Sequence, residues 1–190
     1  MKNILLKIKD SLFSEKLENT EKKVEEVLKT LTVSVEYLDE HDIEEFTEED
    51  RERGYDEVYL ARLSNDLGKM LKVAELETTL SNRHFLLQSI VIETYKLRKE
   101  EKYKNLCLKF SKKHLEEFDV ISQSLKNEFD GSLPRVVTFQ HYATLLTELQ
   151  EYEEAIIICE KAISYGLDDG TKGGYKGRID KIKKKMNSKH

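Results

Sequence analysis

The stretch TFQHYATLLTELQEYEEAIIICEKAISYG, residues 138–166, decides the fold class of this 190-residue chain. Its apolar residues recur every three or four positions, first as far as about Leu149 and again from Tyr152, which predicts two amphipathic helices. Thr138 is a suitable residue to cap the first helix, and Gly166 is a suitable residue to end the second. The polar step between the helices is short, so the stretch predicts an antiparallel helical pair.

The same periodicity continues on both sides of this pair. Further helices are expected at residues 57–80, 84–98 and 103–129 before it and from residue 175 after it. Gly68 divides the first of these in one interpretation, and the third is either a single projecting helix or broken near Asp119. One Pro and eight Gly leave few tight turns for an all-β chain of this length. The sequence therefore predicts an all-α fold of irregular antiparallel hairpins.

Two regions are expected, residues 1–56 and residues 57–190. The first region contains apolar residues at helical spacing at 2–13 and 24–38, although residues 31–37 also alternate as a short strand does. The 2–13 segment either covers the protein's own core, docks in a partner's groove or lies on a membrane surface.

Charge is distributed unevenly along the chain. The overall balance of 32 basic and 37 acidic residues gives −5, which favours neither general nucleic-acid binding nor an acidic tail. Residues 36–57 nevertheless have a local net charge of −10, and residues 171–190 have one of +7. The acidic segment is interpreted as a solvated connector or as a recognition segment in which Ile43 and Phe46 contact a basic partner.

Few chemical motifs accompany this pattern. Cys107 and Cys159 lie in apolar stretches without CxxC spacing, which indicates buried thiols in a reducing, cytoplasmic environment. The five histidines are scattered, and His114 falls within a helical apolar stripe, where a core histidine is the expected interpretation. No signal peptide, membrane span, metal site, cofactor site or catalytic group is predicted.

Residues 138–165 resemble a tetratricopeptide repeat, in which two antiparallel helices pack through large and small residues at fixed positions. The matching positions are Phe139, Ala143, Tyr152, Ala155 and Ala162. Gln150 and Leu167 stand where this family usually has Gly and Pro. A looser copy has its second helix begin at Tyr103. The resemblance implies a stack of about three hairpins in residues 57–190, with the last helix as a cap.

The tail at residues 162–179 is similar to uncharacterised proteins of low-GC Gram-positive bacteria and their phages. The resemblances imply a non-enzymatic module that binds another protein or a peptide, as a scaffold or as a regulator of a host or defence protein. The expected contact residues are Tyr95, Tyr142, Lys172, Tyr175 and Arg178. The alternative is a nucleic-acid-associated regulator that uses the basic residues 171–190. A homo-oligomer is also left open.

Overall fold

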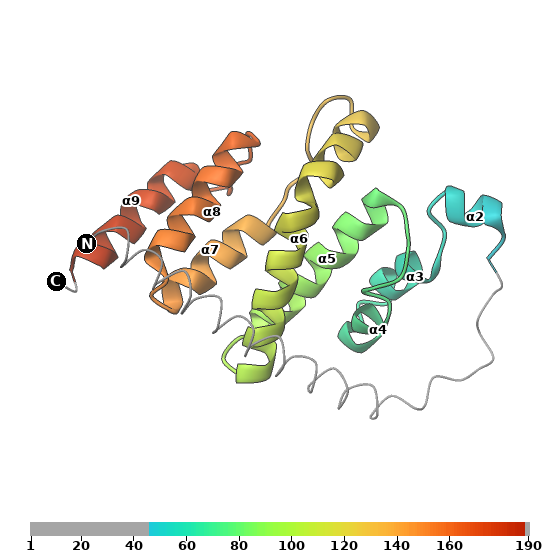
Figure 1. Cartoon of the computed structure of the whole chain (residues 1–190), viewed down its shortest axis with the longest axis horizontal. Helices are drawn as coiled ribbons and strands as arrows, with labels where there is room; N and C mark the ends of the chain where they lie inside the picture. The colour runs from blue at the N-terminus through green and yellow to red at the C-terminus, as the bar shows by residue number, and fades with distance from the viewer. Residues whose placement is uncertain (1–45, 189–190) are drawn as a thin grey trace, which may run out of the picture.

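The computed structural model describes residues 46–188, which form helices and turns and contain no strand. The all-α prediction is therefore confirmed. The helices are α2 (Glu48–Glu52), α3 (Glu57–Leu63), α4 (Leu67–Lys72), α5 (Leu80–Lys96), α6 (Glu101–Glu128), α7 (Thr138–Glu148), α8 (Tyr152–Ser164) and α9 (Gly174–Asn187). They follow one another in sequence order along the long axis (Figure 1). The segments predicted at residues 2–13 and 24–38, with the strand alternative at 31–37, lie outside the described residues, as do residues 36–45 of the acidic segment 36–57.

Helices α5 and α6 form an antiparallel hairpin. Near the turn between the two helices, the Cys107 thiol contacts the Val91 carbonyl oxygen at 3.9 Å. Further along the hairpin, His84 is hydrogen-bonded to His114, and Arg83 forms an ion pair with Glu117. The Arg83 guanidinium contacts both oxygens of Glu117, at 2.8 and 3.1 Å. Burial opposes ionisation of Glu117, but the bonds from Arg83 outweigh it and lower the pKa of this carboxyl.

Helix α6 has 28 residues and is unbroken, so the alternative of a break near Asp119 is wrong. At 1.5 Å per residue it is about 42 Å long. Its first half packs in one hydrophobic cluster with α3, α4 and α5, and its second half packs in another with α7, α8 and α9. Because α6 is common to both clusters, helices α3 to α9 form one continuous packed unit.

A chain of buried polar side chains crosses this unit. His84 Nδ1 and His114 Nε2 share a hydrogen bond of 2.9 Å, and His114 Nδ1 lies 2.8 Å from the Thr138 hydroxyl oxygen. All three side chains are fully buried, so the expectation of a core histidine at 114 is confirmed. Thr138 is the first residue of α7 and not its cap, because its hydroxyl contacts His114 while Val137 occupies the cap position.

The division expected within the 57–80 helix lies elsewhere in the structure. The 57–80 helix is divided at Asn65, which has a φ of +52°, and not at Gly68, which lies inside α4. Asn tolerates the left-handed conformation, and the Asp66 carboxylate accepts a hydrogen bond from the Lys69 N–H at 3.1 Å. These two residues end α3 and begin α4.

The end of the acidic segment is folded. Thr47 and Asp50 form a capping box at α2. The Asn82 amide donates to the Gly54 carbonyl at 2.6 Å and to Asp56 Oδ1 at 3.2 Å, and Asp56 is 2% exposed. The packed unit therefore begins before residue 57.

The turn between α7 and α8 places Gln150 in the left-handed region, with a φ of +68°. Gly166 ends α8 with a φ of +72°, as predicted. The left-handed conformation costs a side-chain-bearing residue about 1–2 kcal/mol, and glycine does not have that cost. Gln150 is exposed, so its side chain offers little packing in compensation.

We expect Gln150→Gly to stabilise the protein by about 0.5–1 kcal/mol, because the relieved strain exceeds the added entropy of the unfolded chain. Thermal unfolding followed by circular dichroism should show a rise of roughly 2–4 °C per kcal/mol. Gln150→Ala is the control, because it removes the same side chain but keeps the Cβ. An equal gain in both variants would contradict the strain argument.

Candidate binding surface

The five contact residues predicted from the sequence separate into two groups. Tyr142 and Tyr175 are 4% and 2% exposed and belong to the core shared by α6, α7, α8 and α9. These two rings are packing residues, because the fold itself covers them. Lys172 is exposed on the loop before α9, and Tyr95 and Arg178 are half-buried.

Tyr95 is part of a layered contact between α5 and α7. Its ring stacks on His141, with centroids 4.0 Å apart and an interplanar angle of 20°. The guanidinium carbon of Arg98 lies 3.9 Å from the same ring centroid. Arg98 also contacts Glu148 Oε1 at 3.0 Å and Oε2 at 3.1 Å. Residues from α5 and α7 thus hold the Tyr95 ring in one orientation.

Arg178 connects α9 to the same region. Its Nε and Nη2 donate to Asp169 Oδ2 at 3.1 and 2.9 Å, and its Nη1 donates to the Thr144 hydroxyl at 2.9 Å. Asp169 is 3% exposed. Burial opposes its ionisation, but hydrogen bonds from Thr171 and Arg178 outweigh that effect and lower the pKa of this carboxyl. The buried carboxylate fixes both the loop and Arg178.

We call this region the α5–α7–α9 face and define it by Tyr95, Arg98, His141, Thr144 and Arg178. His141 and Thr144 are three residues apart on α7 and so are neighbours on its surface. The face is continuous from Tyr95 through His141 and Thr144 to Arg178.

The charges that act on His141 are those of three arginines. Burial, together with the charges of Arg98, Arg178 and Arg135, lowers the pKa of His141 to about 4. Arg98 and Arg178 each have a carboxylate partner. Arg135 is exposed, and none of the residues 46–188 forms an ion pair with it. This arrangement favours a negatively charged group near Arg135.

Arg135 also lines a groove of about 690 Å³ between the α6–α7 loop and the α8–α9 loop. Lys126 and the backbone of Gly131 and Gly170 contribute to the same groove. The groove adjoins the α5–α7–α9 face through the α8–α9 loop, because Asp168 and Gly170 line the groove and Asp169 between them accepts hydrogen bonds from Arg178. A ligand segment can therefore extend from the face into the groove.

The two cysteines lie in the core. Cys107 and Cys159 are free and buried, and burial raises the pKa of each thiol to about 11. A thiol with that pKa is protonated at neutral pH and is a poor nucleophile. Residues 46–188 contain no group of His, Cys, Asp or Glu arranged to hold a metal ion, and none of their helices has the length and hydropathy of a membrane span.

The sequence identified only part of this face. Arg98, His141 and Thr144 of the face were missed, as was Arg135 in the groove beside it, although a helical wheel would have placed Arg98 beside Tyr95 and Thr144 beside His141. The stacking of Tyr95 on His141 depends on how α5 and α7 are aligned, which periodicity does not specify.

The chain matches no protein-family model, and searches of curated proteins and of solved structures gave no match either. The geometry of the α5–α7–α9 face is therefore the basis for assigning a function.

Proposed function

We propose that this protein is a non-enzymatic interaction module that binds an acidic segment of a partner protein on the α5–α7–α9 face. The observation that carries the proposal is the half-buried stack of Tyr95 and His141 beside three arginines. Aromatic and arginine side chains are the types that contribute most to protein interfaces. The tetratricopeptide resemblance at residues 138–165 supports the same class of function.

The face suits a protein ligand because its polar groups are already oriented. Arg98 and Arg178 are held by Glu148 and Asp169, so little side-chain entropy is lost on binding. The Tyr95 and His141 rings offer an apolar contact, and Arg135 is available for a carboxylate of the ligand. In this proposal the partner segment combines a large apolar side chain with neighbouring Asp or Glu residues.

The experiment is capture of partners from an extract of the source cells by the full chain, with and without nuclease treatment. We expect nuclease-resistant, stoichiometric capture of one protein. Arg135→Glu should weaken that capture about tenfold, equivalent to about 1.4 kcal/mol, because it reverses an exposed charge beside the ligand. Tyr95→Ala should weaken it by a similar factor because the stacked surface is lost.

Lys102→Glu is the matched control, because Lys102 is exposed at the start of α6 and the charge change is identical. Its capture should equal that of the unmodified chain. If Lys102→Glu and Arg135→Glu lose the partner to the same extent, general charge and not the α5–α7–α9 face determines binding.

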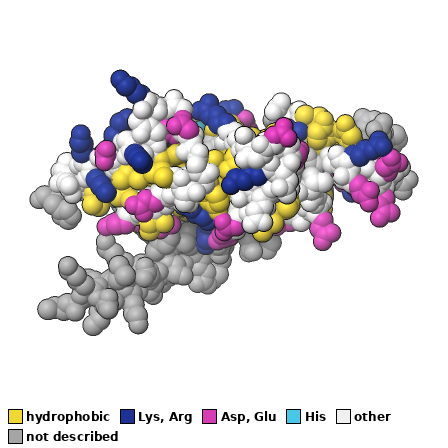
Figure 2. Space-filling view, turned by 90° about the horizontal axis from the view of Figure 1, so that it is seen from above, with side chains coloured by type: hydrophobic (Ala, Val, Ile, Leu, Met, Phe, Trp, Pro, Cys, Tyr) yellow, Lys and Arg dark blue, Asp and Glu magenta, His cyan; other side chains and the backbone are white. Residues whose placement is uncertain are grey.

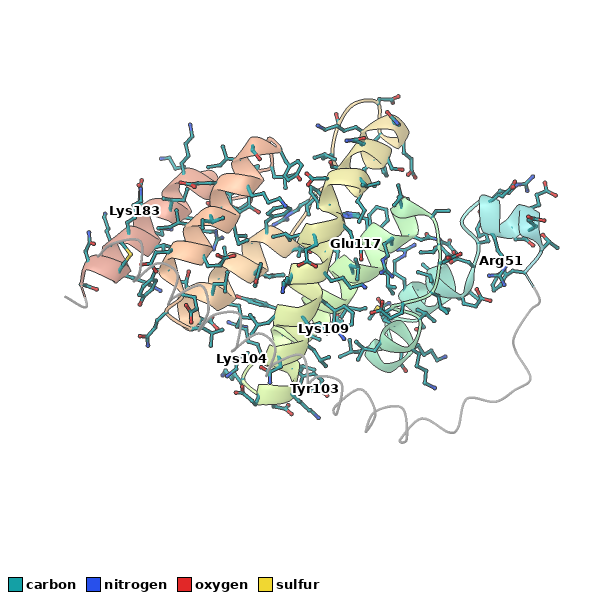
Figure 3. All side chains as sticks on the ribbon, viewed as in Figure 1. Arg51, Tyr103, Lys104, Lys109, Glu117 and Lys183 are labelled. Atoms are coloured by element: carbon teal, nitrogen blue, oxygen red, sulfur yellow. The ribbon has the colours of Figure 1, made fainter. Side chains whose placement is uncertain are left out.

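A second candidate function is nucleic-acid association through α9. Figure 2 shows Lys and Arg side chains projecting at the α9 end of the molecule, and Lys183 projects from α9 in Figure 3. The exposed lysines of α9 form no ion pair with residues 46–188; they are Lys176, Lys181, Lys183, Lys184 and Lys185. Such lysines suit phosphate contacts that carry no sequence preference.

The capture experiment also distinguishes this candidate. Nuclease-sensitive capture that weakens steeply with salt, and that is lost on replacing Lys183, Lys184 and Lys185 by Ala, would favour nucleic acid over a protein partner.

A further inference from the structure

A second pocket lies far from α9, where α3, the start of α5 and the end of α6 meet. It has a volume of about 420 Å³. Tyr55, Tyr59, Arg62 and Phe85 contribute to its wall, together with the acidic residues Glu52 and Glu128. Tyr55 is 49% exposed, so an aromatic surface is open to a ligand there.

Arg62 lacks the partners that a partly buried arginine normally has. Its guanidinium carbon lies 5.3 Å from the ring centroid of Tyr59 and 5.5 Å from that of Phe85. Its Nε is buried and has no hydrogen-bond partner, and no carboxylate of residues 46–188 forms an ion pair with it. A guanidinium has five N–H donors, and buried donors are nearly always bonded to an acceptor.

The wall of the pocket is held in place before any ligand binds. Asn82 donates to the Gly54 carbonyl and to Asp56, which fixes the turn that carries Tyr55. Tyr55 packs edge-on against Tyr59, with centroids 5.3 Å apart. The two flanking rings also restrict the plane in which the Arg62 guanidinium lies. A planar donor held in this way suits an oxyanion, which accepts two parallel hydrogen bonds.

We propose that this pocket binds a carboxylate attached to an aromatic or branched apolar group. Arg62 donates to the carboxylate, while Tyr55 and Phe85 contact the apolar part. Glu52 and Glu128 in the lining repel a dianion more strongly than a monoanion, so a carboxylate is favoured over a phosphate. The ligand is either a free organic acid or an acidic residue of a peptide, and the site is independent of the α5–α7–α9 face.

The test is an NMR titration of the full ¹⁵N-labelled chain, in which the Arg62 Nε–H resonance is identified by its absence in Arg62→Met. The probes are phenylacetate, acetate, benzyl alcohol, phenyl phosphate and the blocked peptide acetyl-Phe-Glu-amide. We expect phenylacetate or the peptide to shift this resonance saturably and more tightly than acetate, benzyl alcohol or phenyl phosphate. Comparison of phenylacetate with acetyl-Phe-Glu-amide distinguishes the free acid from the peptide as the source.

Arg62→Met keeps an apolar stem but removes the donors, so it should weaken binding at least about tenfold, as expected for charge-assisted hydrogen bonds. Because this variant lacks the Nε–H signal, the affinities of all variants are compared through the backbone amide resonances of Tyr55 and Phe85, which line the pocket. Arg51→Met is the matched control, because Arg51 lies outside the pocket lining and is paired with Glu57 at 2.8 Å; its affinity should stay within about twofold of the unmodified chain. Thermal unfolding of both variants verifies that they are folded. Absence of any saturable shift, equal affinity in Arg62→Met, or tighter binding of phenyl phosphate would overturn the proposal.

Discussion

Replacing Phe118 by Ala is expected to lower the free energy of unfolding by about 3–5 kcal/mol, the usual cost of removing a buried phenyl ring. Phe118 is fully buried in the middle of α6. Its ring packs edge-on against Phe139 of α7 and Tyr165 at the end of α8, with centroids 5.2 and 4.9 Å away. It also contacts His114, at 5.7 Å between centroids. The substitution removes contacts with several helices at once.

Urea unfolding followed by far-ultraviolet circular dichroism measures this loss, since the chain has no Trp. Phe129→Ala is the matched control, because Phe129 is 38% exposed at the end of the same helix. Its cost should stay below about 1 kcal/mol. Equal costs at the two positions would mean that Phe118 does not occupy the centre of the packing.

Acid is expected to destabilise the protein through its buried histidines. Burial lowers the pKa of His84 to about 4, and burial together with His84 and Arg83 lowers that of His114 well below its usual value. Both histidines are therefore neutral in the folded protein at pH values where the unfolded chain binds protons. The contribution of the neutral histidines to the free energy of unfolding is complete above about pH 6.5 and is lost as the pH falls toward 4. For His84 alone the loss is about 2–3 kcal/mol by pH 4.5.

Urea unfolding at a series of pH values from 7.5 to about 4.5 tests this expectation. The free energy of unfolding should fall across this range, and the fall should be smaller in His84→Leu, which lacks one of the titrating groups. His84→Leu also changes stability at neutral pH, so the slope with pH is the relevant quantity. A flat profile, or an identical slope in the variant, would show that the imidazole pair does not control acid unfolding.

Helix periodicity predicted the fold better than it predicted helix boundaries. Residues 84–98, 103–129 and 138–165 read as helices because their apolar residues recur at three- and four-residue steps, and packing in the structure follows those stripes. The prediction of a division at Gly68 was wrong, because capping by the Asp66 side chain starts α4 before Gly68 and outweighs the low helix propensity of that glycine. The helix divides at Asn65 instead. The prediction that Thr138 caps α7 was wrong, because the Thr138 hydroxyl forms a hydrogen bond with His114, which lies 24 positions earlier in the chain.

The candidate surface was less predictable, since surface chemistry depends on residues from different helices. Tyr142 and Tyr175 looked like contact residues because a tyrosine suits either a core or an interface, and only the packing of α7 and α9 shows that both are buried. His141 and Arg62 carry no signal in the sequence. Their significance comes from rings and charges that the fold brings together from α3, α5, α7 and α9.

The unbroken α6 helix has a consequence for how the protein responds to ligands. Each hydrophobic cluster contains one half of α6. Unfolding of either cluster therefore exposes half of the helix on which the other cluster also depends. A ligand on the α5–α7–α9 face should therefore raise the protection of backbone amides in α3 and α4 against hydrogen exchange, although it makes no contact with them. In a true array of independent repeats, that protection would fade with each hairpin away from the ligand.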